Sequence, residues 1–408
     1  MPASQAIRPP SSPTIGAGMI PYGKHHIDDA DIQAVVDVLR GNLLTQGPTI
    51  EAFEKAIATY VGAKYAVAMA SATAGLHVSA LAAGVGPGNT LITSPITFVA
   101  SANAGIYCGG QVAFADIDPA TVNMCPVSLQ ETVVKLKNVR AIIPVHFAGL
   151  PCDMPAIKKA ADSAGAAVIE DAAHALGATY PGGKRVGCCA HSLMTVFSFH
   201  PVKAIAAGEG GMVTTNDEPT YRKLLRLRSH GINKANDPLQ LPEQALTNGE
   251  ANPWYYEMQE LGFHYRITDI QCALGLSQFK KLERFLARRR ELVTAYDKAF
   301  AGMKSCVPAQ TTGRDLSGHH LYVLRINFAA AGTTRPRFMA ALRNRGIGTQ
   351  VHYIPVPAHP FYRRMGLKPG DYPNSQEYYH SALSIPLFYD LTNAQQKQVV
   401  EAVKELLP

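Results

Sequence analysis

The sequence predicts an α/β protein with a mainly parallel β-sheet covered by helices on both faces. Short apolar segments alternate with segments of helical length between residue 65 and about residue 229, an order typical of βαβ units. Residues 65–115 contain no Asp, Glu, Lys or Arg, as in strands and helices buried on both faces. The chain has 408 residues, 47% of them hydrophobic, which is enough for a large core and more than one domain.

Seven strands are expected in the first part of the chain. They cover residues 65–69, 90–93, 111–115, 141–145, 167–170, 194–198 and 211–214. Helices are expected at 73–83, 97–108, 154–164 and 220–229. In such sheets, ligands bind beyond the carboxyl ends of the strands.

The sequence pattern changes after about residue 268. Residues 270–299 are predicted to form one or two long helices, followed by strands at 321–328 and 348–352, a helix between them at 336–345, and a closing helix at 393–407. We therefore predict three parts: a flexible N-terminal tail at 1–19, a large domain at 20–268, and a smaller C-terminal α/β domain at 269–408.

Composition narrows the classes of function. Lys and Arg exceed Asp and Glu by 38 to 31, but charged residues make up only 17% of the chain, which favours a small anionic substrate over nucleic acid. Gly, Pro, Ser and Thr interrupt the charge-free stretch, so it does not predict a membrane span. Seven cysteines without a CxxC pair and the lack of an apolar leader predict a cytoplasmic protein without disulfides.

The histidines do not predict a metal site. His25 and His26 are adjacent, as are His319 and His320, and the side chains of neighbouring residues diverge on both helices and strands.

A turn of small residues follows the first predicted strand. Ser71, Ala72 and Thr73 open the next helix, where backbone N–H groups and the helix dipole favour a phosphate. The alternative is a simple helix N-cap, and the turn alone favours that alternative slightly.

Two charged residues occur where charge is scarce. Asp171 directly follows a strand, where it can pair with a cationic ring nitrogen, hold a metal or cap a turn. Lys203 ends the uncharged run 186–202 and precedes a Gly-rich segment. A lysine held among small and apolar residues has a lowered pKa and becomes a nucleophile, whereas an isolated lysine more often extends its amine into solvent.

The order of these three features predicts one cofactor. Pyridoxal phosphate needs an anion site for its phosphate, a carboxylate for its ring nitrogen and an amine for its aldehyde. No GxGxxG motif after a strand, Walker A motif or HExxH motif competes with this interpretation.

Seven motifs in order resemble the DegT/DnrJ/EryC1/StrS family of pyridoxal-phosphate sugar aminotransferases. They are LTQGP at 44–48, SATA at 71–74, TFVAS at 97–101, VHFAG at 145–149, EDAAHA at 170–175, FSFHPVK at 197–203 and GEGG at 208–211. The resemblance extends from Ile20 to Leu407 and implies a fold-type I transferase.

The resemblance also implies roles for individual residues. Lys203 matches the lysine that condenses with the cofactor and then moves the proton, and Asp171 matches the partner of the pyridinium nitrogen. The remaining cofactor-binding matches are Ala72, Thr73 and Ser198 at the phosphate, Phe98 stacked on the ring and His174 beside the ring hydroxyl.

A further cofactor contact is implied to come from a partner subunit. The family motif Gly-Tyr-Asn-Tyr-Arg places an Asn on the phosphate of the partner in a homodimer. The matching segment here is Gly-Phe-His-Tyr-Arg at 262–266, so His264 replaces that Asn and leaves the contact open.

The implied reaction transfers an amino group from an amino acid, L-glutamate in the family, to C4 of a nucleotide-linked 4-keto-6-deoxy sugar. Lys24, His320 and His352 are candidates for binding this anionic substrate. Other members of the family act on different keto sugars or cyclitol ketones. A few members are dehydratases in which another residue replaces the lysine, and the presence of Lys203 argues against a dehydratase. A non-catalytic regulator that binds the cofactor and a sugar-nucleotide binder without covalent chemistry are the alternatives from other classes.

Overall fold

The computed structural model describes residues 18–233 and 237–407 of the chain. The predicted tail at 1–19 therefore lies outside the described residues, except for residues 18–19.

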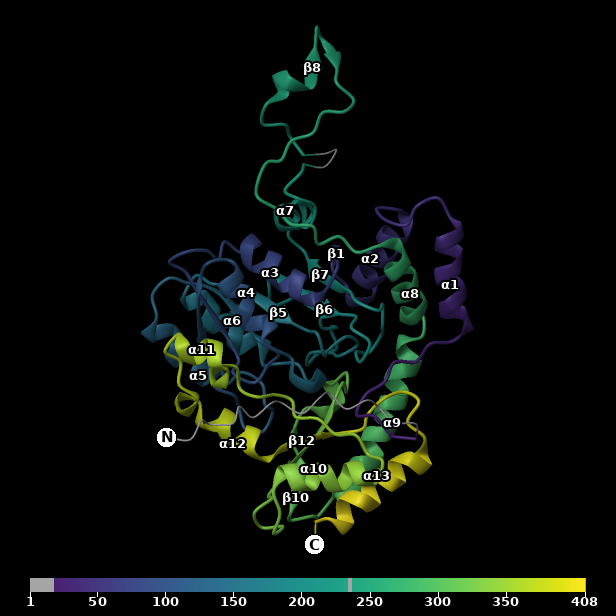
Figure 1. The fold of residues 1–408 in the computed structure, drawn as a ribbon. Coiled ribbons are helices and arrows are strands. Elements are labelled where there is room, and N and C mark those ends of the chain that lie inside the picture. The colour runs from purple at the N-terminus through teal and green to yellow at the C-terminus, as the bar shows by residue number, and fades with distance from the viewer. Residues whose placement is uncertain (1–17, 234–236, 408) are drawn as a thin grey trace, which may run out of the picture.

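A seven-stranded sheet forms the centre of the larger part of the molecule (Figure 1). Its strands are β1 Tyr65–Met69, β2 Thr90–Thr93, β3 Gln111–Phe114, β4 Val139–Ile143, β5 Ala167–Asp171, β6 Met194–Ser198 and β7 Gly211–Thr215, in the spatial order β1-β7-β6-β5-β4-β2-β3. Only β7 runs against the others. An irregular loop without a helix joins β6 to β7, so the chain returns antiparallel instead of crossing over. The prediction of a mainly parallel sheet is confirmed.

Helices cover both faces of this sheet. Core side chains of α3 Ala72–Ala82, α4 Ala100–Tyr107 and α7 Glu218–Arg228 pack on one face. On the other face lie α2 Pro48–Val61, α5 Pro126–Lys135 and α6 Met154–Ser163, together with α8 Asp269–Phe279, which packs against α1 Asp29–Arg40 and α2. Burial on both faces accounts for the scarcity of charge between residues 65 and 115.

The carboxyl ends of the six parallel strands meet at one edge of the sheet, and β7 begins at the same edge. Gly211 is the register partner of Met69 on one side and of Ser198 on the other. The first turn of α3, the end of β5 at Asp171 and the end of β6 at Ser198 therefore lie together, as expected for a ligand site in this class of sheet.

A smaller three-stranded antiparallel sheet lies in the C-terminal part, with β10 Cys306–Pro308, β11 Tyr322–Ile326 and β12 Ala382–Ile385. The helices around it are α9 Leu282–Phe300, α10 Arg335–Asn344, α12 Pro373–Ser381 and α13 Asn393–Glu405, whereas α11 Pro360–Arg364 packs against the large sheet through Tyr362. The boundary at residue 268 stays a prediction.

The predicted strand at 348–352 is wrong. This segment makes a single bridge, between Gln350 and Ser384 of β12, and β12 pairs with β11 along its other edge. The segment instead brings His352 and Tyr353 to the sheet edge.

Residues 237–261, which we call the arm, project from the body beyond α7 and bear the hairpin of β8 Leu246–Thr247 and β9 Glu250–Ala251 near their tip (Figure 1). Large apolar side chains of the arm are exposed, with Trp254 at 72% and Leu261 at 75%. Among the residues that the structure describes, none of the helices has the length and apolar character needed to cross a membrane.

Candidate active site

A cavity of about 480 Å³ lies at the carboxyl edge of the large sheet. Nine of the predicted site residues line it: Ala72, Thr73, Phe98, Asp171, His174, Ser198, Lys203, His320 and His352. They come from segments spread over 280 residues of sequence, and the parallel sheet brings them together.

One end of the cavity is formed by the first turn of α3. Ser71 caps this helix by accepting a 3.1 Å hydrogen bond from the N–H of Ala74, so the N-cap interpretation is correct. Gly211 allows the helix to approach, since a Cβ at this position would lie 2.5 Å from the backbone nitrogen of Ala72. The N-terminus of α3 thus faces the cavity beside Ser198, an arrangement suited to a phosphate.

Asp171 lies at the end of β5 and is held by two hydrogen bonds. Its Oδ2 accepts a 2.6 Å bond from the Ser101 hydroxyl, and its Oδ1 accepts a 3.1 Å bond from the N–H of Ala173. Thr97 donates to Ser101 over 2.8 Å, because the Ser101 hydrogen is already committed to the carboxylate. This chain of hydroxyls fixes the orientation of the carboxylate.

Lys203 projects into the same cavity from the loop between β6 and β7. Burial lowers the pKa of its amine to about 8, and the negative charge of Asp171 opposes part of this shift. Near pH 8 a substantial fraction of the amine is therefore unprotonated and nucleophilic, whereas at pH 7 the ammonium form predominates.

His174 and Tyr353 form one wall of the cavity. The Tyr353 hydroxyl lies 3.2 Å from Nε2 of His174, whose Nδ1 accepts the N–H of Ala148. Burial, followed by the charge of Lys203, holds the pKa of His174 well below its usual value, so the ring is neutral. Phe98 is 59% exposed at the mouth, with its ring centroid 6.4 Å from that of Tyr353.

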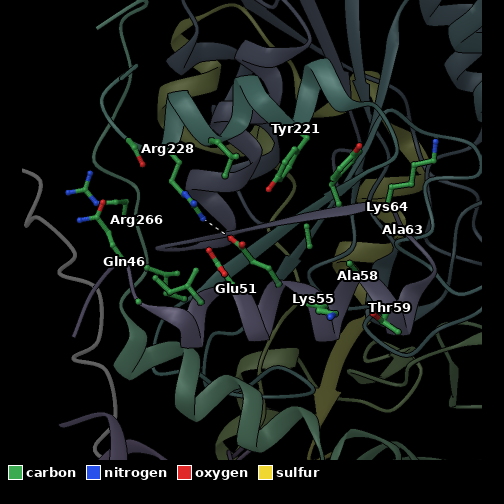
Figure 2. A pocket seen from close by; sticks show the side chains of 18 residues that line it. Gln46, Glu51, Lys55, Ala58, Thr59, Ala63, Lys64, Tyr221, Arg228 and Arg266 are labelled. Atoms are coloured by element: carbon green, nitrogen blue, oxygen red, sulfur yellow. Dashed lines mark hydrogen bonds and ion pairs between the residues drawn. The ribbon is translucent and has the colours of Figure 1, made fainter. Parts of the chain in front are cut away.

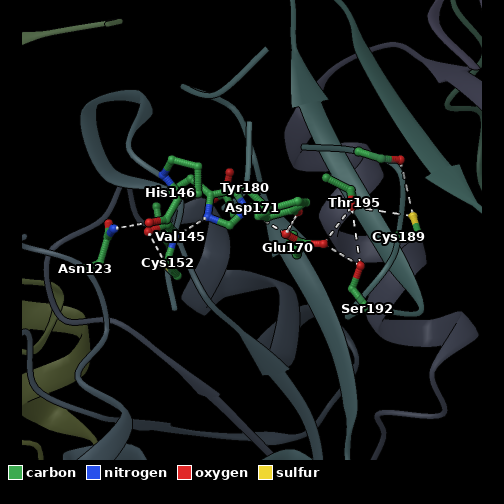
Figure 3. A network of polar contacts seen from close by, with 12 residues as sticks. Asn123, Val145, His146, Cys152, Glu170, Asp171, Tyr180, Cys189, Ser192 and Thr195 are labelled. Carbon is green, nitrogen blue, oxygen red and sulfur yellow. Dashed lines mark hydrogen bonds and ion pairs between the residues drawn. The ribbon is translucent and has the colours of Figure 1, made fainter. Parts of the chain in front are cut away.

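A buried polar network lies behind the end of β5 (Figure 3). The Glu170 carboxylate accepts hydrogen bonds from His146, Tyr180, Ser192 and Thr195. Nδ1 of His146 accepts the backbone N–H of Cys152, so Nε2 carries the hydrogen donated to Glu170.

The same network fixes the backbone of β5 at its functional end. The N–H of His146 donates to the carbonyl of Asp171 over 3.1 Å, and the N–H of Asp171 donates to Pro144 over 2.9 Å. The side chain of Glu170 points to the opposite face of the strand from Asp171. There it holds His146, whose backbone N–H bonds the carbonyl of Asp171.

Two predicted residues lie outside this cavity. Lys24 is exposed and lines a narrow hollow on the other side of Lys203. His264 is also exposed; it forms a bridge with Ser229, and its ring lies 5.3 Å from that of His230. Neither residue is placed against the cavity of its own chain.

The sequence interpretation missed several residues of the site. Ser101, which holds Asp171, stands out in the sequence only as part of the TFVAS motif. Tyr22, Glu209 and Tyr353 also line the cavity. The spacing of Thr97 and Ser101 by one helical turn was the available signal for their hydrogen bond.

A second hollow, of about 770 Å³, lies between α2, β1 and α7 (Figure 2). Two of its charged groups bind each other: Nη1 of Arg228 donates to Glu54 and to the carbonyl of Ala68, each over 2.7 Å. This hollow does not combine an unpaired lysine with a strand-end carboxylate.

The donor set of the first cavity fits pyridoxal phosphate. A helix N-terminus, an oriented carboxylate and a nucleophilic amine converge on one space, and these are the three groups that this cofactor requires. The fold and site thus define a fold-type I transferase with an aminotransferase architecture.

The chain belongs to the DegT/DnrJ/EryC1/StrS aminotransferase family, whose pattern matches residues 25–404. It is 40% identical over 390 residues to the spore coat polysaccharide biosynthesis protein SpsC of Bacillus subtilis, covering 95% of this chain and 97% of SpsC. The aminotransferases of this family depend on pyridoxal phosphate.

Solved structures agree with this assignment. Helicobacter pylori PseC, an aminotransferase involved in the biosynthesis of pseudoaminic acid, superimposes with a TM-score of 0.85 at 29% identity, covering 95% of this chain and 99% of PseC. Spr1654 of Streptococcus pneumoniae in its PLP form gives a TM-score of 0.83 at 27% identity, covering 96% and 100% of the two chains.

Proposed function

We propose that the protein is a pyridoxal-phosphate-dependent aminotransferase. It moves an amino group from L-glutamate to C4 of a nucleotide-linked 4-keto-6-deoxy sugar. The observation that carries this proposal is the convergence of Lys203, Asp171 and the N-terminus of α3 on one cavity. When bound, pyridoxal phosphate supplies an aldehyde that condenses with amines and a ring that stabilises negative charge on a neighbouring carbon.

Different residues of the cavity would then bind the phosphate and the ring of the cofactor. Backbone N–H groups at Ala72 and Thr73, with the hydroxyl of Ser198, hold the phosphate. Asp171, oriented by Ser101, keeps a proton on the ring nitrogen, and this positive charge favours the electron-rich transition state. As the family resemblance implies, His174 would lie beside the ring hydroxyl and Phe98 would stack on the ring.

Lys203 acts twice in this scheme. Its amine, with a pKa lowered to about 8, first binds the cofactor covalently. Once the amino donor had displaced it, Nζ would take the proton from the α-carbon of the donor and deliver it to the cofactor carbon bonded to the same nitrogen. The second half of the reaction reverses these steps on the keto sugar, so we expect ping-pong kinetics.

We infer that the sugar is UDP-linked and belongs to pseudaminic acid biosynthesis. The stretches TSPITF at 93–98, FHPVK at 199–203, RSHGI at 228–232, WYYE at 254–257 and LGF at 261–263 resemble UDP-4-amino-4,6-dideoxy-N-acetyl-β-L-altrosamine transaminase. The structural similarity to PseC supports the same assignment. His320 and His352 line the cavity and are proposed to contact the substrate. Lys24 lines a separate hollow, and its proposed contact with the substrate is not supported by the cavity lining.

A different keto sugar is the second candidate. The higher identity to SpsC, whose name refers to spore coat polysaccharide, favours it.

Seven free thiols fit a reducing compartment, and we propose the cytoplasm as the place of reaction.

We further propose a homodimer with shared active sites. His264 is exposed and lies outside the cavity of its own chain, so it is available to the phosphate of a partner, as its family motif implies. Exposed apolar side chains on the arm, such as Trp254, supply contact area for a second copy.

Mixing two defective variants tests the shared site. If sites are shared, combining Lys203→Ala with His264→Ala restores one complete site per mixed dimer and recovers activity that neither variant has alone. Activity no higher than the sum of the two separate variants contradicts a shared site.

Activity is tested by incubating the purified protein, after addition of pyridoxal phosphate, with glutamate and a panel of 4-keto sugar nucleotides. The proposal predicts conversion of the cofactor to its amine form by glutamate, followed by amination of a UDP-linked sugar. Cofactor binding without conversion by any amino donor identifies a regulator instead.

A further inference from the structure

His320 is the side chain that faces the amine of Lys203 most directly. Its Nε2 lies 3.5 Å from Nζ of Lys203, and the residue is 5% exposed. The backbone of this segment is fixed, since the N–H of His320 donates to Ala148 over 2.8 Å and Nη1 of Arg289 donates to the carbonyls of His319 and His320. The ring therefore has a defined position beside the amine.

Two other buried histidines of the cavity, His174 and His352, are held through their Nδ1 atoms. In His174, Nδ1 accepts the N–H of Ala148, and in His352, Nδ1 lies 2.8 Å from the hydroxyl of Ser384. By contrast, Nδ1 of His320 is buried and has no hydrogen-bond partner among the described residues. Among the described residues, no hydrogen bond at Nδ1 fixes the tautomer of this ring, so Nε2 can accept a hydrogen from Lys203 or donate one to it.

Burial and neighbouring positive charge keep this ring neutral at physiological pH. Burial is the largest cause of a pKa well below the usual value for His320, and charges around the ring add to it. The groups that face it are Lys203, His174, Arg289 and His352. The repulsion from Lys203 disappears once Lys203 loses its proton, so the two side chains together hold a single proton.

We propose that His320 is a catalytic residue that takes the proton from the Lys203 ammonium and later returns it. In this step the N–H bond at Nζ breaks as an N–H bond at Nε2 forms, and the electron pair left on Nζ becomes the nucleophile. The imidazolium then returns its proton to Nζ of Lys203 when the amino donor displaces this nitrogen, or it loses the proton to solvent. This inference rests on the proposed aminotransferase function and adds a second proton carrier to its site.

The test separates hydrogen bonding from proton transfer. Gln places an amide near Nε2 but cannot be protonated, so His320→Gln retains a polar neighbour for Lys203 without a base. His320→Leu removes both, and His380→Gln, an exposed histidine on α12, is the control. Circular dichroism checks folding; should His320→Gln not fold, His320→Asn takes its place.

The readout is the rate at which added pyridoxal phosphate develops its covalent absorbance, measured from pH 6 to pH 10. At pH 7 a pKa of about 8 leaves about a tenth of the Lys203 amine unprotonated, so we expect a decrease of up to about tenfold in His320→Gln, with no change in the control. Above the Lys203 pKa of about 8, the rates of His320→Gln and wild type should converge. Identical pH–rate profiles for wild type and His320→Gln would overturn the role of His320. Absence of covalent absorbance in the wild type would instead overturn the proposed function.

Discussion

The hydroxyl of Ser101 donates a 2.6 Å hydrogen bond to Oδ2 of Asp171, and both residues are buried. Ser101 lies in the first turn of α4, and Asp171 ends β5. The bond therefore ties the helix that follows β2 to a central strand, at the place where a ring nitrogen is expected to bind.

Replacing Ser101 by Ala should weaken the site without abolishing it. A hydrogen bond to a charged group contributes about 1.5–3 kcal/mol, so we expect looser cofactor binding and turnover lower by about tenfold or more. Cofactor titration and kcat measure these effects, with Ser163→Ala at the end of α6 as control. Equal values in wild type and Ser101→Ala would show that Asp171 is oriented without this bond.

Asp171→Asn should bind the cofactor but turn over slowly. The amide preserves the shape of the carboxylate, yet it cannot hold a positive charge on the ring nitrogen, and we expect kcat to fall by at least about 10²-fold. Stopped-flow measurement of the half-reaction with glutamate checks this. A near wild-type rate would show that another group protonates the ring.

Lys203→Ala should lose both the covalent absorbance and turnover while remaining folded, since removing a partly buried amine leaves no broken ion pair among the contacts that the structure describes. A Tm within a few degrees of wild type confirms folding. Lys64→Ala, an exposed lysine at the second hollow, is the matched control. Retained turnover in Lys203→Ala would remove this residue from its role.

Glu170 should control stability at acid pH. Burial pushes its pKa up, but the donors from His146, Ser192 and Tyr180 outweigh burial and leave the pKa below its usual value. The stability that these bonds supply is therefore present above about pH 4.5 and is lost as the pH falls through the lower folded pKa.

The variant Glu170→Gln keeps the size of the side chain and removes the charge. We expect its free energy of unfolding at pH 7 to fall by about 1–3 kcal/mol and to depend less on pH below 4.5 than that of the wild type. Urea unfolding at several pH values measures both quantities. An unchanged acid dependence would mean that other carboxylates dominate.

The large sheet could be predicted because each of its strands carries a local signal. All seven predicted segments coincide with observed strands to within about two residues at either end, since buried parallel strands form short apolar runs between helices. The direction of β7 could not be predicted, because it depends on a loop of 12 residues that looks like any other connection.

The site could be predicted in part because some of its residues also have a local signal in the sequence. Asp171 is recognisable by its place at the end of a predicted strand, Lys203 as the charge that ends an uncharged run, and Ser71 by its place before a helix. The hydrogen bond from Ser101 to Asp171 joins residues 70 positions apart, and the placement of Tyr353 depends on a segment expected to be a strand. Such pairings arise only when distant elements pack together.

The central claim is that Lys203 forms a covalent bond with pyridoxal phosphate. The most direct measurement is reduction of the cofactor-loaded protein with borohydride, followed by mass spectrometry of its peptides. We predict a single pyridoxyl-phosphate adduct on Lys203. Unlabelled Lys203, or a label on a different lysine, would contradict the account.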